Sequence, residues 1–286
     1  MVRIANHLYF QKNLGMKFIF ILFFIVSCSH VKKENSETFK LIQEIENTLE
    51  VRVGVFAFQT TGKNISYREN ERFLMCSTFK LLLCAQLLDR VAKEKESLEE
   101  FVRISNKDII QWSPVTKKHV GKKMSLGALC KATIQMSDNT AANKLLKKME
   151  GPKALTSYLR EQGDLITRLD RYEPSLNVLN GEMDTTTPSS MTNTIKKVYS
   201  KRLDNWLRGA KTGKTRLKSG LPTNWAFAHK TGTCEGGPSN DVGIIYPVSG
   251  EPIYVSVFVE GENASFKQRE KAHQSIARLI TKYYSK

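Results

Sequence analysis

Patterns typical of β-strands stand at both ends of the chain, and patterns typical of helices fill its middle. Near the N-terminus, "VRVGVFAFQT" (51–60) alternates as a strand does, and "NISYR" (64–68) follows a turn as its hairpin partner. Strand patterns return at residues 224–230, 241–247 and 252–260. This order excludes a doubly wound parallel sheet, because that fold needs strands and helices that alternate along the chain.

The simplest fold that fits is of the α+β class, in the α/β sandwich type. Strands from both chain ends form one five-stranded antiparallel sheet, and amphipathic helices at 38–50 and roughly 266–283 cover it. The stretch from Ser77 to about residue 205 is mostly helical, with breaks at 112–116, 121–123 and 171–190.

Two domains follow from this order of elements. We expect an α/β domain made of residues 38–75 and 210–286, and an all-helical domain, residues 76–209, inserted into it. A cleft is expected where the two domains meet, since ligand sites tend to lie at such junctions.

The N-terminus indicates export. Lys17 is followed by "FIFILFFIV" (18–26), an apolar run too short to span a bilayer, so residues 1–28 are expected to be a signal sequence. Met16 begins a better-formed signal than Met1 does. The "IVSC" that ends at Cys28 resembles the lipobox of bacterial lipoproteins, which implies lipidation of Cys28 and a tether over 29–37. The alternative is ordinary cleavage nearby and a soluble periplasmic protein.

The net charge of +16 does not by itself indicate a nucleic-acid partner. The lysines are scattered, and no finger, basic-zipper or RNA-recognition signature is present, so we interpret the charge as a solvated basic surface. The five histidines show no ligand spacing, and no metal is expected.

Export to an oxidising compartment would allow the cysteines to form disulfides. With Cys28 set aside, four remain, at positions 76, 84, 130 and 234. An even number in an oxidising compartment predicts two disulfides, for which three connectivities are possible. The sequence alone does not choose among them.

Three short motifs follow one another along the chain. "MCSTFK" (75–80) contains S-x-x-K, which chance alone produces at roughly one position in 400. "SDN" stands at 137–139 and "KTG" at 230–232, and each is expected at about one position in 8,000. The three together, in this order, form a specific signal.

The first motif suggests a nucleophile and its base. Ser77 and Lys80 are three residues apart and share one face of a helix, and unpaired N–H groups at a helix N-terminus favour a developing negative charge. Lys80 serves as a base if burial and a second amine, Lys230, lower its pKa. In isolation, the alternatives are an N-cap serine and a solvated lysine.

With "RYEPSLN" (171–177) and "LPTNW" (221–225), the motifs resemble class A serine β-lactamases over the whole chain after the tether. The resemblance implies hydrolysis of the β-lactam amide of penicillins, with cephalosporins and carbapenems as further candidate substrates. It also implies a serine acyl-enzyme, a water activated by a glutamate, no cofactor, and a monomer.

The same resemblance implies a role for each matched residue. Ser137 relays a proton to the departing nitrogen, and Asn139 holds the substrate's side-chain amide. The oxyanion hole is formed by the backbone N–H groups of Ser77 and Thr233. The segment that binds the substrate carboxylate contains Lys230, Thr231, Gly232 and Thr233.

Three further residues match less specific parts of the family pattern. "TGKTR" (212–216) resembles the segment that supplies Thr212 and Arg216 to the carboxylate. Trp112 matches an aromatic gate beside the cleft, for which a buried packing role is the alternative.

Glu173 separates a hydrolase from its relatives. Glu173 and Asn177 resemble the pair that holds the water for deacylation, and a cis bond is plausible before Pro174. A DD-peptidase, or a penicillin-binding sensor that acylates without fast turnover, would share the rest of the site. From Arg171 to Asp184, which should form a salt bridge, the loop is about two residues shorter than expected, so the sensor stays an alternative.

The resemblance also implies how the cysteines pair. In the carbapenem-hydrolysing branch, a cysteine before the nucleophile is bridged to one after the K-T-G-T segment, which here gives Cys76–Cys234. Many class A enzymes have a second bridge, which here gives Cys84–Cys130. Two buried free thiols are the alternative for this second pair.

Overall fold

The computed structural model describes residues 37–234 and 237–285. The predicted signal sequence with Met16 and Cys28, and residues 29–36 of the predicted tether, lie outside this part. The chain divides into two compact units, Met1–Leu41 and Ile42–Lys286, of which the second is described below. No helix within the described ranges is both long enough and apolar enough to cross a membrane.

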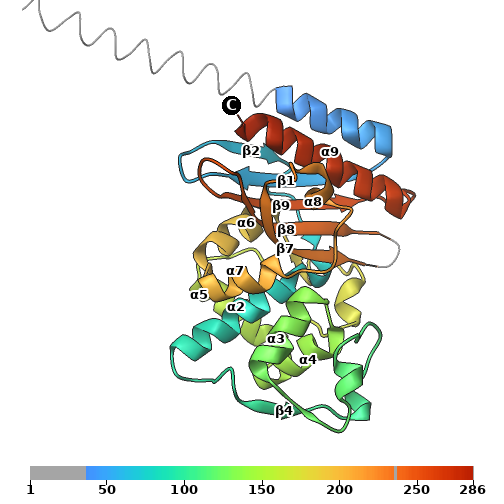
Figure 1. The fold of residues 1–286 in the computed structure, drawn as a ribbon. Helices are drawn as coiled ribbons and strands as arrows, with labels where there is room; N and C mark the ends of the chain where they lie inside the picture. The colour runs from blue at the N-terminus through green and yellow to red at the C-terminus, as the bar shows by residue number, and fades with distance from the viewer. Residues whose placement is uncertain (1–36, 235–236, 286) are drawn as a thin grey trace, which may run out of the picture. The chain divides into compact units, whose positions relative to one another are not determined.

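A five-stranded antiparallel sheet forms the centre of the second unit, with strand order β2-β1-β9-β8-β7 (Figure 1). The first strand pairs with the last one, with Arg52 opposite Glu260 and Phe58 opposite Tyr254. The predicted fold class is therefore confirmed, since both ends of the chain contribute to one sheet. The strands of this sheet are β1 (Arg52–Phe58), β2 (Asn64–Tyr67), β7 (Ala226–Thr233), β8 (Ser239–Tyr246) and β9 (Ile253–Glu260).

Helices flank the sheet on both faces (Figure 1). The helical residues 42–49 and α9 contribute to one apolar cluster with the sheet, while α2 to α7 contribute to another. The helices are α2 (Phe79–Ala92), α3 (Leu126–Gln135), α4 (Asn139–Lys148), α5 (Pro152–Glu161), α6 (Pro188–Lys197), α7 (Lys201–Arg208), α8 (Leu217–Gly220) and α9 (Phe266–Tyr284). The 3₁₀ turns are η1 (Cys76–Thr78), η2 (Asn106–Asp108), η3 (Thr116–His119) and η4 (Ser175–Asn177).

The sheet has two apolar faces because side chains alternate along each strand. In β9, Val255, Val257 and Val259 belong to the cluster that contains α9. Phe258 belongs to the other cluster, where its ring stacks on Phe73 with centroids 5.5 Å apart. The sheet thus joins the two cores, which explains why its central strands are apolar on both sides.

Short strands interrupt the segment that the sequence predicts to be all helical. Within residues 76–209, β4 (Phe101–Arg103) pairs with β5 (Lys123–Ser125), and β6 (Thr185–Thr186) pairs with β3 (Phe73–Leu74), which precedes this segment. The description of residues 76–209 as all helical is corrected in this respect. Strands of two or three residues are too short to show the alternating pattern by which a strand is recognised in sequence.

Helix α2 explains how a lysine reaches the interior. It contains the run Leu81, Leu82 and Leu83, and all three side chains are fully buried. The first nine residues of α2, from Phe79 to Leu87, are all buried, so this part of the helix lies in the core on every side. Lys80, in the first turn of this helix, is therefore carried into the interior with its neighbours.

We expect Phe258→Ala to lower the free energy of unfolding by about 3–5 kcal/mol, because it removes a buried ring and leaves a cavity between the sheet and Phe73. Urea unfolding followed by circular dichroism measures this. Phe101, which is 58% exposed, is the matched control. Its substitution by alanine should change the free energy by less than about 0.5 kcal/mol. Equal effects of the two substitutions would contradict the prediction.

Candidate active site

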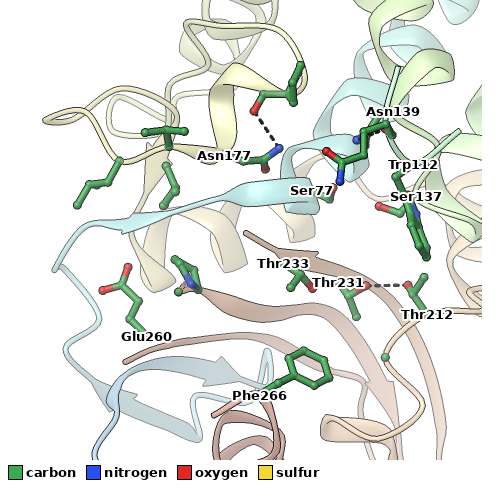
Figure 2. Close-up of a pocket in the computed structure, with 18 of the residues that line it drawn as sticks. Ser77, Trp112, Ser137, Asn139, Asn177, Thr212, Thr231, Thr233, Glu260 and Phe266 are labelled. Atoms are coloured by element: carbon green, nitrogen blue, oxygen red, sulfur yellow. Dashed lines mark hydrogen bonds between the residues drawn. The ribbon is translucent and has the colours of Figure 1, made fainter. Parts of the chain in front are cut away.

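Ser77 and Lys80 meet where η1 leads into α2. Nζ of Lys80 lies 2.9 Å from Oγ of Ser77. The Lys80 side chain is fully buried, and Ser77 is 8% exposed, at the floor of a cleft of about 1310 Å³. The predicted shared face is therefore present, and the serine is the member of the pair that is open to a ligand (Figure 2).

Glu173 approaches the same two residues from a loop. Its Oε1 lies 3.0 Å from Nζ of Lys80 and 3.4 Å from Oγ of Ser77, and its side chain is buried. Nδ2 of Asn177 donates to Oε2 of Glu173 at 2.6 Å. The Glu173–Pro174 peptide bond is cis. Serine, amine and carboxylate thus stand within hydrogen-bonding distance of one another.

The loop that holds Glu173 is fixed at its two ends and at the backbone of Glu173 itself. The predicted salt bridge closes it, with Nε of Arg171 2.6 Å from Oδ2 of Asp184. Asn143, on α4, binds both backbone groups of Glu173: Oδ1 accepts from its N–H at 3.0 Å, and Nδ2 donates to its carbonyl at 2.8 Å. Asn143 was not predicted. Four residues after Asn139, it shares that residue's face of the helix, which was the available signal.

The S-D-N segment contributes through each of its residues. Nζ of Lys80 lies 3.0 Å from the carbonyl oxygen of Ser137 and also contacts Oδ1 of Asn139. Ser137 has a positive φ of 57°, a conformation sparsely populated by residues other than glycine. Asp138 caps α4 by accepting from the N–H of Ala141 at 2.8 Å. The helix cap and the site are therefore one structure.

The K-T-G segment lies within β7, along the opposite side of the cleft (Figure 2). Nζ of the fully buried Lys230 lies 3.1 Å from Oγ of Ser137. A Cβ at Gly232 would come within 2.6 Å of the carbonyl oxygen of Met75 and 3.2 Å of Cβ of Cys76. Only glycine lets β7 approach so close to the residue before the serine.

Thr212 and Arg216 both line the cleft, beside β7. Oγ1 of Thr212 is 2.7 Å from Oγ1 of Thr231. Arg216 donates to the backbone carbonyls of Gly232 and Asn240, each at 2.8 Å, and to Oγ1 of Thr233. These side chains form one polar wall of the cleft.

Trp112 faces the cleft from the opposite wall (Figure 2). Its side chain is 60% exposed, so the alternative of a buried packing residue is wrong. Its Nε1 donates to the carbonyl of Met136 at 3.1 Å, which fixes the ring while leaving most of its surface open.

Three basic side chains, Lys80, Arg216 and Lys230, are buried at the site. Burial lowers the pKa of Lys80, although Glu173 opposes this shift, and burial lowers the pKa of Arg216. Burial, then the neighbouring charges of Lys80 and Arg216, lower the pKa of Lys230 well below its ordinary value. A carboxylate bound beside Lys230 and Arg216 would favour the charged forms of both groups, so the wall is suited to an anionic ligand. Among the described residues, no cluster suited to a metal ion is present.

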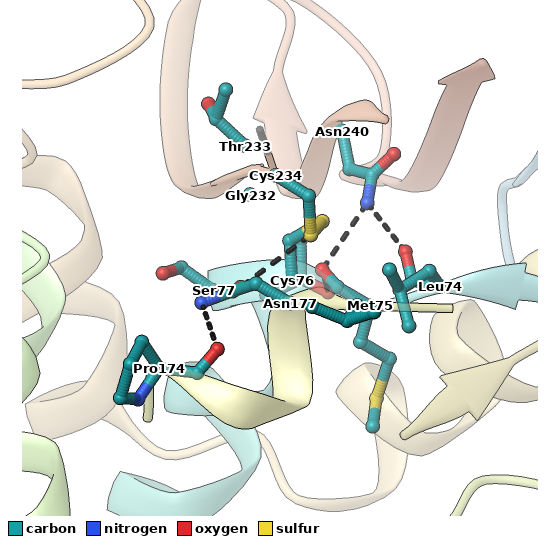
Figure 3. Close-up of a disulfide and its surroundings, with 12 residues drawn as sticks. Leu74, Met75, Cys76, Ser77, Pro174, Asn177, Gly232, Thr233, Cys234 and Asn240 are labelled. Carbon is teal, nitrogen blue, oxygen red and sulfur yellow. Dashed lines mark hydrogen bonds between the residues drawn. A yellow bond between two sulfur atoms is a disulfide. The ribbon is translucent and has the colours of Figure 1, made fainter. Parts of the chain in front are cut away.

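The Cys76–Cys234 disulfide is present and joins the residue before Ser77 to the end of β7 (Figure 3). Sγ of Cys234 lies 3.4 Å from Oδ1 of Asn177, so the bridge also contacts the amide that binds Glu173. Asn240, which was not predicted, donates to the carbonyls of Leu74 and Met75 at 2.9 and 3.1 Å. Two separate links thus hold the serine's segment against the sheet.

The second predicted disulfide, Cys84–Cys130, is not formed, and this prediction is corrected. Both cysteines are free and buried within the helical core. Sγ of Cys84 faces the backbone carbonyl oxygen of Cys130, at 3.7 Å. The two residues pack as small apolar side chains, which was the alternative reading.

A family model described as the β-lactamase enzyme family matches residues 37–284. The solved structure of a β-lactamase from Xanthomonas campestris aligns with a TM-score of 0.85 at 34% identity, over 88% of this chain and 98% of the other. The class A β-lactamase of the last common ancestor of Gram-negative bacteria aligns with a TM-score of 0.84 at 42% identity, over 86% and 99%. The chain belongs to the class A β-lactamase family.

Two curated relatives extend this finding within the class A family. β-Lactamase SME-1 of Serratia marcescens is 33% identical over 265 residues, which are 88% of this chain and 90% of the relative. The carbapenem-hydrolysing β-lactamase KPC of Klebsiella oxytoca is 35% identical over 240 residues, 79% of this chain and 82% of the relative. The resemblance drawn from the motifs is confirmed.

The cysteine assignment predicts a definite labelling pattern. Alkylation of the denatured, unreduced protein should modify Cys84 and Cys130 and leave Cys76 and Cys234 unmodified, as peptide mass spectrometry will show. Reduction before alkylation should add label at Cys76 and Cys234. Protection of Cys84 and Cys130 before reduction would contradict the correction above.

Proposed function

We propose that the protein hydrolyses the amide bond of β-lactams in two steps, through an acyl-enzyme formed on Ser77. The observation that supports this most directly is the position of Lys80, whose amine contacts the serine hydroxyl and the Glu173 carboxylate at 2.9 and 3.0 Å. A nucleophile with a base on one side and a second base within 3.4 Å meets the geometric requirement for acylation followed by hydrolysis.

In the first step, Oγ of Ser77 attacks the lactam carbonyl and Lys80 accepts the hydroxyl proton. The lowered pKa of Lys80 supports this role, because a buried amine loses its proton more readily than an exposed one. The charge that develops on the carbonyl oxygen is stabilised by the backbone N–H groups of Ser77 and Thr233. Ser137, which lies between the two lysine amines, passes a proton to the departing nitrogen.

In the second step, Glu173 and Asn177 hold a water and Glu173 removes its proton as it attacks the ester. Two features support this assignment. Glu173 is fixed by Asn143 through its backbone and by Asn177 through its carboxylate. Its Oε1, which also contacts Nζ of Lys80, lies 3.4 Å from Oγ of Ser77, on which the ester would form. A DD-peptidase does not need this carboxylate. Neither the site nor the comparisons favour a DD-peptidase.

The substrate carboxylate is bound by Lys230, Thr231, Thr233, Thr212 and Arg216, and the side-chain amide by Asn139, with Trp112 as the opposite wall. Gly232 contributes by permitting the close approach of β7. Penicillins and cephalosporins are the proposed substrates. Carbapenems are included because the Cys76–Cys234 bridge is typical of that branch and because one relative is named as carbapenem-hydrolysing.

We further propose that the protein is exported to the periplasm as a monomer, held to the membrane by lipid on Cys28. The apolar run at 18–26 and the lipobox-like sequence support this proposal. The division into an α/β domain (38–75 and 210–286) and a helical domain (76–209) is likewise a proposal, supported by two main apolar clusters.

Benzylpenicillin in large molar excess tests the two steps. Wild-type protein should consume it completely, and Ser77→Ala should consume none. Glu173→Gln should consume one equivalent in a burst and then turn over about 10²–10⁴-fold more slowly, because only the water has lost its base. A burst of one equivalent by the wild type would favour the sensor, and no reaction would contradict the proposal.

The acylation base can be tested by pH in the Glu173→Gln protein. The charge on Glu173 raises the pKa of Lys80, and burial lowers it below the ordinary 10.5. Removing the carboxylate charge should therefore lower the lysine pKa further. The neutral amine is lost as pH falls through that pKa, so the rate of the burst should fall on the acid side. Lys80→Arg should slow the burst at every pH, and a burst rate unaffected by Lys80→Arg would exclude Lys80 as the base.

A further inference from the structure

A buried histidine–aspartate pair lies beside the cleft and takes no part in the chemistry proposed above. Nδ1 of His229 donates to Oδ1 of Asp241 at 2.7 Å, and the two side chains are 2% and 0% exposed. Neither residue is among those that line the cleft. Burying two ionisable groups costs desolvation free energy that two apolar side chains would not. We call this contact the His229–Asp241 pair.

The pair stands on the same face of the sheet as the threonines of the cleft wall. Side chains alternate along β7, so His229 shares a face with Thr231 and Thr233, while Lys230 points to the other side. In the register of β7 and β8, Asp241 stands directly opposite Thr231. Its carboxylate therefore reaches diagonally past Thr231 to bind the imidazole.

The segment that carries Thr212 and Arg216 rests against this pair. Gly213 has a φ of 74° and lies so close that a Cβ there would be 2.3 Å from Cγ2 of Thr231 and 3.3 Å from Cε1 of His229. The imidazole also stacks on Phe227, with ring centroids 4.4 Å apart. The methyl group of Thr231 and the imidazole of His229 together limit how closely Gly213, and with it Thr212, can approach β7.

Charge adds a second link between the pair and the cleft wall. Asp241 is the first of the neighbouring charges that favour the charged form of Arg216 against the effect of its burial. Oδ2 of Asp241 and Nε of Arg216 are both buried and without a hydrogen-bond partner among the described residues. The pair therefore places a negative charge behind a wall that is otherwise cationic.

We propose that the His229–Asp241 pair is a positioning pair for the carboxylate-binding wall formed by Thr212, Thr231 and Arg216. The inference rests on the proposed function, in which that wall binds the carboxylate of a β-lactam. The pair makes no described hydrogen bond to Ser77, Lys80 or Glu173. It acts on capture of the substrate and acylation, and leaves hydrolysis of the acyl-enzyme unchanged.

The experiment compares benzylpenicillin with its methyl ester, which lacks the carboxylate. His229→Leu keeps the bulk of the side chain and removes the donor. It should lower kcat/KM for benzylpenicillin about tenfold through KM, with kcat changed less than about threefold. For the ester, kcat/KM of the variant should stay within about threefold of the wild-type value. The acid preference, which is the ratio of kcat/KM for benzylpenicillin to kcat/KM for its ester, should therefore fall severalfold, up to about tenfold. His229→Asn should restore the preference, because its Nδ2 is bonded to Cγ as Nδ1 of histidine is.

Two controls separate positioning from loss of structure. His119→Leu changes a histidine at the end of η3, which does not line the cleft and whose Nδ1 contacts the carbonyl of Val115. It should leave kcat/KM for both substrates unchanged. If the His229→Leu protein does not fold, as judged by thermal melting, the His229→Gln protein is used in its place. The glutamine amide lies one carbon further from the backbone than the asparagine amide, so it does not reproduce the Nδ1 donor.

Three results would overturn the inference or its premise. An equal fall in kcat/KM for benzylpenicillin and for its ester, with kcat also reduced, would mean that the pair only stabilises the fold. A folded His229→Leu or His229→Gln protein with an unchanged acid preference would show that the pair does not act on the wall. Failure of the wild type on both compounds would contradict the proposed function itself, before any variant is compared.

Discussion

The buried amine of Lys80 is the contact on which the rest of the site depends. It lies within hydrogen-bonding distance of oxygens from Ser77, Glu173, Ser137 and Asn139, which come from three separate segments of the chain. A fully buried lysine is tolerated only where such oxygens replace water. The contacts that make the amine tolerable are therefore also the ones that bring nucleophile and carboxylate together.

The same reasoning explains the opposite wall of the cleft. Lys230 and Arg216 are buried among backbone carbonyls of β7 and β8, which accept their hydrogen bonds but do not cancel their charge. A wall of this kind is most stable when an anion completes it, so affinity for a carboxylate follows from how the strands are arranged. The negative charge of Asp241 behind the wall limits the excess of positive charge there.

Residues in short motifs could be predicted from sequence, because three-residue patterns such as S-D-N are rare by chance. The contacts of Asn240 and the pairing of His229 with Asp241 could not be predicted, since each involves single polar residues in regular elements. For Asn143, the sequence offered only its position on the same face of α4 as Asn139. The contacts of these residues join positions 12 to 166 residues apart. The incorrect prediction of a Cys84–Cys130 disulfide has a similar cause. Four cysteines can form two disulfides, or one disulfide and two free thiols, and only the packing of the chain decides between these arrangements.

The strand order has a consequence for how the protein is made. β9, the last strand of the chain, lies at the centre of the sheet, between β1 and β8. The contacts of Ser77 with Glu173 and of Cys76 with Cys234 span 96 and 158 residues. Native contacts of such long range are slow to form, because a large loop must close before they contribute. A growing chain that ends before β9 lacks the centre of its sheet, so the site is acquired late and as a whole.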